Sequence, residues 1–152
     1  MFALIQALRL EGACARARAQ VPGSFGRLGD PAAETSWVPG TLLLELMAQT
    51  AGPLLEELHA EPRWAVLGLV RAARFPAPTP LPAEGVTLEV LAEQLRWEHG
   101  SGVARAWVEV AGELRAQAEL VFSLQPPAPG WEAAIAARDA RVARWLAAWE
   151  GA

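Results

Sequence analysis

The sequence predicts an α+β protein in which one long antiparallel sheet wraps a single central helix and a second helix follows at the C-terminus. Three observations lead to this fold class. One segment, after Pro39 and Gly40, has the length and apolar character of a buried helix. Segments with strand-like composition and short glycine turns lie on both sides of it. Their order is strand, strand, helix, strand and three-strand meander, which is typical of an α+β layout.

The central helix carries one carboxylate, Glu45, in its first half. At about 100° per residue, the stripe that holds this carboxylate contains Thr41, Glu45, Gln49, Gly52 and Glu56. Most of the remaining circumference is apolar, so the helix should be largely buried. Two interpretations of Glu45 follow: it lies on a thin solvated stripe, or it faces a pocket where it could transfer protons. Pro53 predicts a kink or break between residues 49 and 53.

Two strands joined by a tight turn are expected before the helix, over residues 2–10 and 13–21. In the second strand Arg16, Arg18 and Gln20 alternate with alanine and valine, the period of a half-buried strand. Residues 22–36 contain glycine and proline breakers, among them Pro22, Gly23, Gly29 and Pro31, and should form a loop.

A further strand is expected over residues 64–75, with Gly68 inside it. A glycine there often marks close approach by another backbone or a ligand. Proline at every second position from 76 to 82 predicts an extended connector that cannot be a central strand. Short turns containing glycine then join an antiparallel meander. Its strands are expected over residues 86–97, 103–110 and 114–124.

A last helix is expected over residues 131–149, after a proline-rich linker. Its apolar stripe consists of Trp131, Ile135, Val142, Trp145 and Trp149. Such a stripe should dock on the sheet or on a second copy of the chain. We therefore divide the chain into a sheet-and-helix domain over residues 1–125 and a linker with a packed helix over residues 126–152.

Composition excludes several classes of function. A net charge of −4 argues against a general nucleic-acid binder, which would show a basic face. The single cysteine, Cys14, excludes an intrachain disulfide and fits a reducing compartment. No apolar run reaches about 18 residues, and Met1 to Leu10 does not read as a signal peptide. We expect a cytoplasmic protein without a membrane segment, a metal site or a cofactor.

Residues 39–49, Pro-Gly-Thr-Leu-Leu-Leu-Glu-Leu-Met-Ala-Gln, resemble the Pro-Gly-x-Leu-x-x-Glu-x-Met-Ala-Gln signature of the FabZ-type β-hydroxyacyl-acyl carrier protein dehydratases. Residues 67–75 resemble that family's Gly-(Ile/Leu)-x-x-Ala-(Lys/Arg)-Phe stretch. With the meander, the resemblance covers most of residues 38–124. It implies a hotdog fold, in which the sheet wraps the helix, and a homodimer or higher homo-oligomer with active sites at the interface.

The resemblance also implies a set of site residues. Glu45 would be catalytic with Gln49 one turn later, and the backbone N–H of Gly40 would polarise a thioester carbonyl. The substrate-binding residues implied are Val38, Pro39, Leu42, Gly68 and Phe75. Arg71 and Arg74 would dock an acidic carrier protein.

The chain departs from the family at the catalytic histidine, which lies fourteen residues before the glutamate and is Pro31 here. His59 and His99 lie elsewhere and are expected at the surface. Losing a positioned acid or base typically costs about 10² to 10⁴ in rate. Asp30 or Glu34 could approach the vacant position, with different chemistry.

A second departure follows Phe75, where Pro76, Ala77 and Pro78 replace the basic residues usual in the family. Besides Arg71 and Arg74, only Arg96 is left as a candidate for docking a carrier protein.

Three functions are consistent with these features. The signature favours a dehydratase-like hydro-lyase of fatty-acid metabolism, acting on 3-hydroxyacyl thioesters. A thioesterase could instead use Glu45 as base or nucleophile without the histidine. A non-catalytic acyl-binding subunit would need a second chain to complete its site. In each case the expected ligand is an acyl thioester of coenzyme A or of acyl carrier protein.

Overall fold

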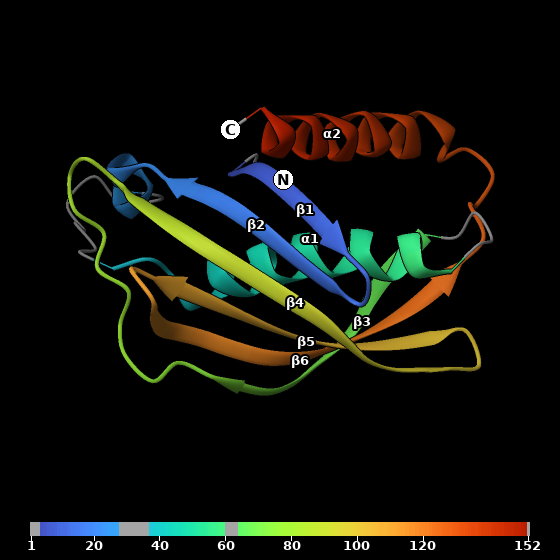
Figure 1. The fold of residues 1–152 in the computed structure, drawn as a ribbon, viewed down its shortest axis with the longest axis horizontal. Coiled ribbons are helices and arrows are strands. Elements are labelled where there is room, and N and C mark those ends of the chain that lie inside the picture. Colours follow the sequence, from blue (N-terminus) through green and yellow to red (C-terminus); the bar gives the residue numbers. More distant parts are fainter. Residues whose placement is uncertain (1–3, 28–36, 60–63, 152) are drawn as a thin grey trace.

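The computed structural model describes residues 4–27, 37–59 and 64–151. Strands β1 and β2 and a short 3-10 helix come first, and α1, β3, the three strands of the meander and α2 follow (Figure 1). The elements are β1 (Ile5–Glu11), β2 (Cys14–Val21), η1 (Gly23–Arg27), α1 (Gly40–Leu58), β3 (Trp64–Arg74), β4 (Val86–Glu98), β5 (Ser101–Val110), β6 (Glu113–Gln125) and α2 (Glu132–Glu150).

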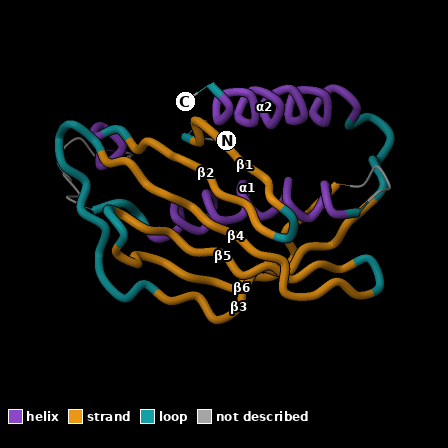
Figure 2. The backbone as a smooth tube through the Cα atoms, in the orientation of Figure 1, coloured by secondary structure: helices purple, strands orange, loops and turns teal. Residues whose placement is uncertain are grey.

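The six strands form one sheet in the order β1-β2-β4-β5-β6-β3, and every neighbouring pair is antiparallel. The sheet curves around α1, which contacts all six strands (Figures 1 and 2). The meander is β4, β5 and β6, and the chain after α1 returns as β3 to the outer side of β6. The α+β class and the single central helix are therefore confirmed.

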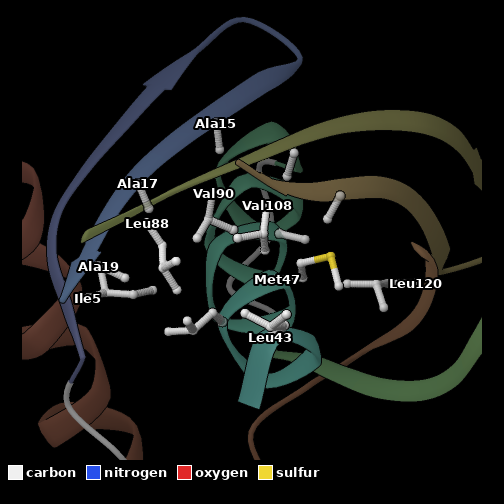
Figure 3. Close-up of a cluster of buried hydrophobic side chains, with 14 of the residues drawn as sticks. Ile5, Ala15, Ala17, Ala19, Leu43, Met47, Leu88, Val90, Val108 and Leu120 are labelled. Carbon is white, nitrogen blue, oxygen red and sulfur yellow. The ribbon is translucent and has the colours of Figure 1, made fainter. Parts of the chain in front are cut away.

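The core lies between α1 and the inner face of the sheet. Small side chains from β2 and larger ones from β4 point toward α1 (Figure 3). Ala15, Ala17 and Ala19 let β2 approach the helix closely, while Leu43 and Met47 fill the space from the helix side. Each fully buried leucine or methionine contributes roughly 1.5–3 kcal/mol.

Two-residue turns join the meander strands, with positive φ at both turn residues. The first contains His99 (φ 50°) and Gly100 (φ 76°), and the second contains Ala111 (φ 50°) and Gly112 (φ 80°). These angles suit the right-handed twist of the flanking strands. Because the first turn is this short, β5 begins at Ser101, two residues before the predicted start.

Of the two predicted effects of Pro53, a kink or a break, the break is wrong, because α1 runs through Pro53 as one continuous helix. Proline removes one helical donor and costs about 3 kcal/mol in an exposed helix. Here Pro53 is buried with Leu54 and Leu55 inside the curved sheet. Tertiary packing of the apolar faces is therefore enough to keep the helix continuous.

The two edges of the sheet differ. Helix α2 packs against β1 at one edge (Figure 1). At the other edge β3 has two irregularities, near Gly68 and near Ala72, and among the described residues no strand pairs with its outer side. Its exposed apolar side chains include Val66, Leu67 and Leu69. An open apolar edge strand is a template for pairing with another strand.

Helix α2 docks through part of the predicted stripe. Trp145 is buried in the core. The Arg18 guanidinium lies over the ring of Trp149, with 4.5 Å between the Arg18 Cζ and the ring centroid. Trp131 does not join them: it is 52% exposed and packs edge-on against Trp64, with ring centroids 5.2 Å apart. It precedes the first turn of the helix, so it lies beyond the face that the sheet covers. None of the helices in the described part of the chain is long and apolar enough to span a membrane.

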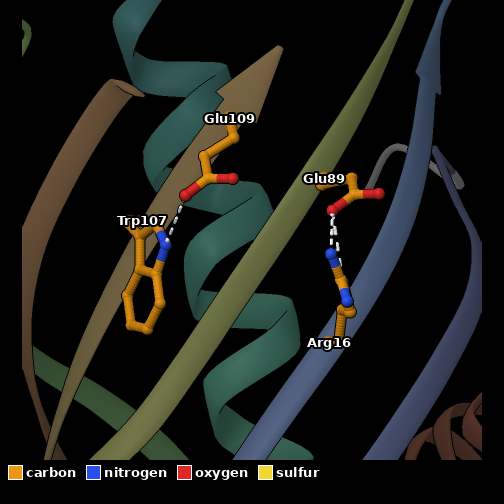
Figure 4. A network of polar contacts seen from close by, with 4 residues as sticks. All are labelled: Arg16, Glu89, Trp107 and Glu109. Atoms are coloured by element: carbon orange, nitrogen blue, oxygen red, sulfur yellow. Dashed lines mark hydrogen bonds and ion pairs between the residues drawn. The ribbon is translucent and has the colours of Figure 1, made fainter. Parts of the chain in front are cut away.

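The outer face of the sheet carries polar contacts, some across strands and some within one strand. Arg16 donates to Glu89, with 2.5 Å between Nη2 and Oε2, and the indole N–H of Trp107 donates to Glu109 (Figure 4). Further along the sheet Arg105 pairs with a β4 carboxylate in the same way. Arg16 and Arg105 are therefore each paired with a carboxylate of the neighbouring strand β4.

Candidate functional site

The start of α1 is fixed by backbone contacts to the proline-rich connector. The N–H of Val38 donates to the carbonyl of Thr79 over 2.8 Å, and Trp37 forms an isolated bridge with Pro80. No side chain of the described residues caps the helix, and its first turn contains no acidic residue. The N-terminal end of the helix dipole at Gly40 is therefore not neutralised by a carboxylate of the first turn.

Phe75 lies directly against this helix start. A Cβ placed on Gly40 would be 3.2 Å from the Phe75 ring, closer than nearly all real contacts. Glycine is therefore the residue that allows the ring to rest on the first turn. Phe75 is 45% exposed and so forms part of the surface beside the helix N-terminus.

Glu45 and Gln49 form a hydrogen-bonded pair one turn further along. The Gln49 Nε2 donates to Glu45 Oε1 over 2.6 Å. The opposite amide orientation would place two acceptors against each other, so the carboxylate fixes which way the amide points. The Gln49 Oε1 is then buried without a hydrogen-bond partner among the described residues. Glu45 itself is exposed in the single chain.

The stripe of α1 that holds this pair becomes progressively more buried toward the C-terminus. Thr41 and Glu45 are exposed, Gln49 is half-buried and Gly52 is buried. A Cβ on Gly52 would lie 3.8 Å from the Phe122 ring and 3.9 Å from the Ala65 Cβ. Of the two interpretations of Glu45, the one that places it on a solvated stripe therefore fits the single chain, but only over the first half of the helix.

Glu56 ends the stripe and joins three elements. Its Oε1 accepts the Ala65 N–H over 2.7 Å, and its Oε2 pairs with Arg138 of α2. Burial raises the pKa of this carboxyl, and the hydrogen bond from Ala65 and the charge of Arg138 only partly oppose that effect. The sequence placed Glu56 on the stripe but gave no signal for these partners, because they come from distant segments.

The other residues implied by the resemblance do not all reach this surface. Val38 and Leu42 are buried in the core behind it, and Pro39 is the residue before the first turn, with its carbonyl accepting from Leu42. Gly68 lies opposite Val121 at the first irregularity of β3, on the open edge.

Arg71 and Arg74 belong to the outer face of the sheet. Arg71 pairs with Glu119 over 2.8 Å, and Arg74 donates to the Gln117 side chain over 3.0 Å. The hydrogen bond from Arg71 lowers the pKa of Glu119.

Neither histidine lies near the pair on α1. His59 follows the last turn of the helix; it is half-buried rather than a surface residue, stacks on Trp97 at 3.5 Å and bonds to Gln94. His99 is exposed in its turn. Pro31, and Asp30 and Glu34 on either side of it, lie outside the described residues.

The described residues contain no group of three or more histidine, cysteine, aspartate or glutamate side chains that could hold a metal ion. In the first half of α1, the groups that the described residues place at the surface or at the helix start include the Glu45 carboxylate, the Gln49 amide and the backbone N–H groups of the N-terminus.

Comparison with known proteins identifies the fold. No protein-family model matches the sequence, and no curated protein matches it. Among solved structures, the chain is similar to a conserved protein from Pseudomonas aeruginosa, with 20% identity, a TM-score of 0.62, and coverage of 78% of this chain and 89% of that one.

Two further structures are described as thioesterases or members of that superfamily. A thioesterase from Haemophilus influenzae has 12% identity and a TM-score of 0.59, with 77% of each chain covered. A thioesterase-superfamily protein from Shewanella loihica has 21% identity and a TM-score of 0.57, with 80% of this chain and 91% of that one covered. At these identities the likeness establishes the hotdog fold, as the resemblance implied.

Proposed function

We propose that the protein hydrolyses acyl thioesters, with Glu45 as the catalytic carboxylate. The observation that carries this proposal is the Glu45–Gln49 hydrogen bond beside an uncapped helix N-terminus. The thioesterase-like fold neighbours add support. A second acid or base, which dehydration requires, is not found beside Glu45 in the described part of the chain.

In the proposed reaction the thioester carbonyl lies at the start of α1. Its oxygen accepts from the Gly40 N–H, and the helix dipole stabilises the negative charge that develops there. With Glu45 as base, the carboxylate takes a proton from water while the water oxygen bonds to the carbonyl carbon, the carbon–sulfur bond breaks, and the leaving thiolate takes that proton from Glu45. With Glu45 as nucleophile, the carboxylate bonds to the carbonyl carbon and expels the thiolate, which takes a proton from water, and a water molecule then hydrolyses the resulting anhydride to the free acid and Glu45. In both routes Gln49 holds the carboxylate in position.

Dehydration of a 3-hydroxyacyl thioester is the second candidate, because residues 39–49 match the dehydratase signature. In that reaction Glu45 would exchange a proton with the substrate, and a group outside the described residues would supply the other proton transfer. A non-catalytic acyl-binding subunit is the third candidate.

Glu45→Gln tests the assignment. We expect the variant to lose at least about 10²-fold in thioester turnover with its fold unchanged, because the amide cannot act as a base. Glu57→Gln is the matched control, since Glu57 is an exposed glutamate of the same helix. Free thiol released from a plain acyl thioester supports hydrolysis, and enoyl product from a 3-hydroxyacyl thioester supports dehydration. Full activity in Glu45→Gln refutes both.

Coenzyme A is the carrier that we favour over an acidic carrier protein. Arg71 and Arg74 already bond to side chains of β6, and Arg105 and Arg16 to β4 carboxylates. An acidic protein would have to displace these partners before it could use the arginines.

A homodimer formed through β3 is also part of the proposal. The open edge carries exposed apolar side chains, Leu69 at 53% among them, and pairing with a second copy would cover them. We expect a dimer by light scattering at micromolar concentration. Leu69→Glu should weaken it, whereas Leu114→Glu, at an exposed leucine of β6, should not. A wild-type monomer under these conditions contradicts this part of the proposal.

A further inference from the structure

Near its end, strand β3 contains one residue more than the segment of β6 that it faces. Arg71 is paired with Glu119 and Arg74 with Gln117, and each arginine side chain bonds to its partner. Three steps along β3 therefore match two steps along β6. The additional residue forms a β-bulge, and inside it the backbone of Ala72 has a φ of 50°.

This bulge decides which face of the sheet Phe75 occupies. Arg71 and Phe75 are four residues apart, so in a regular strand both side chains would lie on the outer face. With the additional residue, Arg71 and Arg74 share the outer face, and Phe75 turns to the inner face. There its ring lies against Gly40, 3.2 Å from the position of a Cβ on that residue.

Ala72 holds a backbone conformation that is unfavourable for a residue with a Cβ. The left-handed φ of one class of bulge is normally supplied by glycine, and here alanine supplies it. Such local strain persists only where the surrounding structure enforces it, and it is concentrated at functional sites. The strained residue here is three positions before the ring that rests on the start of α1.

Resting on the proposed function, we infer that Ala72 is a positioning residue, which acts through the bulge to keep the Phe75 ring on the first turn of α1. The ring occupies the side of Gly40 where a side chain would otherwise stand, so it fixes this turn and keeps water from that side. The Gly40 N–H is the donor proposed for the thioester carbonyl. A donor that is already fixed stabilises the charge developing in the transition state without reorganising.

The test replaces Ala72 in the full-length protein by valine or by glycine. Valine is β-branched and tolerates positive φ poorly, so it should favour the regular strand and turn Phe75 outward. Glycine adopts this φ freely and should keep the ring on Gly40. Ala111→Val is the matched control, because Ala111 is an exposed alanine with the same φ of 50° in the turn between β5 and β6.

Hydrolysis of a short acyl-coenzyme A thioester is followed as thiol release. Removing a donor of this kind outright costs about 10² to 10³ in kcat. Ala72→Val leaves the donor and displaces only its support, so we expect kcat to fall at least about tenfold with KM nearly unchanged. Ala72→Gly and the control Ala111→Val should keep the wild-type kcat.

Two further variants show whether Ala72 acts through the ring. Phe75→Leu removes the ring and leaves the bulge, so it should lower kcat by a similar factor, and adding Ala72→Val to it should cost nothing more. Deleting Ala73 from the Ala72→Val protein removes the additional residue. A regular strand then again places Arg74 opposite Gln117 and Phe75 on the inner face, so kcat should recover.

A second measurement does not depend on catalysis. An aromatic ring packed on a glycine shifts the NMR signal of the glycine amide, which is observed after labelling the protein with isotope-enriched glycine. Phe75→Leu identifies the Gly40 signal, because it removes this shift. We expect Ala72→Val to remove the same shift and deletion of Ala73 to restore it.

The outcomes separate this inference from the proposed function. If the Gly40 signal follows the variants but the wild type hydrolyses no thioester, the proposed function fails and the placement of Phe75 by Ala72 is supported. If the wild type is active and Ala72→Val changes neither kcat nor the signal, the inference is overturned and hydrolysis stands. An equal loss of kcat from Ala72→Val with and without the Phe75 ring also overturns it, since Ala72 would then act by another route.

Discussion

Replacing Gln49 by methionine should stabilise the fold while it removes activity. The Gln49 Oε1 is buried without a partner among the described residues, and such an acceptor costs about 1–3 kcal/mol. Methionine has a similar length and removes this cost. It also removes the hydrogen bond to Glu45, worth about 0.5–1.5 kcal/mol because Glu45 is exposed. The expected net gain is about 1 kcal/mol.

Thr79→Val is the matched control. The Thr79 side chain is 2% exposed, and its hydroxyl is also buried without a partner. Valine keeps the shape and suits the extended backbone, so we expect a similar gain of about 1 kcal/mol. Because Thr79 contributes only its backbone carbonyl to the helix start, turnover should be unchanged.

Urea unfolding at neutral pH measures both variants, with the stability change read from the midpoint at constant slope. The corresponding increase in Tm is about 2–4 °C per kcal/mol for a domain of this size. Turnover of a short acyl thioester is measured on the same preparations. If Gln49→Met loses more than about 1 kcal/mol while Thr79→Val gains stability, the amide oxygen has a partner in the assembled protein and the reasoning fails.

The remaining predictions concern helix α2 and the carboxyl groups of Glu56 and Glu119. Trp145→Ala should cost about 3–5 kcal/mol in urea unfolding because the ring is buried, whereas the exposed Trp131→Ala should cost far less; equal costs would contradict the docking. Glu56 has a raised pKa, so its stabilising contribution is complete below its ordinary value of 4.5 and is lost as pH rises through the raised pKa. Glu56→Gln should remove that decline. Glu119 has a lowered pKa, so its contribution is present above 4.5 and is lost on further acidification. Glu119→Gln should remove that loss; unchanged pH profiles would contradict either assignment.

Local pattern predicted the strands and helices well, because period and turn chemistry act within a few residues. The alternation of Arg16 and Arg18 with alanines marks β2, and the glycine turns mark the meander. Pro53 misled the prediction of α1, since the burial that keeps the helix continuous comes from the whole sheet. Trp131 fitted the periodic stripe of α2 but lies before its first turn.

The candidate site was predictable only where it is local. Glu45 and Gln49 are one helical turn apart, so their hydrogen bond follows from spacing. The contact of Phe75 with Gly40 and the ion pair of Glu56 with Arg138 join segments distant in sequence. No periodicity encodes such contacts.

The two edges of the sheet differ in whether they are free to pair with a strand of another molecule. With α2 packed against β1, β3 is the edge strand of the described sheet that neither a helix nor a second strand covers on its outer side. Two such edges satisfy each other, and no further edge is left to extend the array. In a variant truncated before Gly130, the edge of β1 would be uncovered as well, so that strands of other copies could pair at both edges of the sheet. In the proposed dimer, the C-terminal helix would therefore prevent further strand pairing at β1.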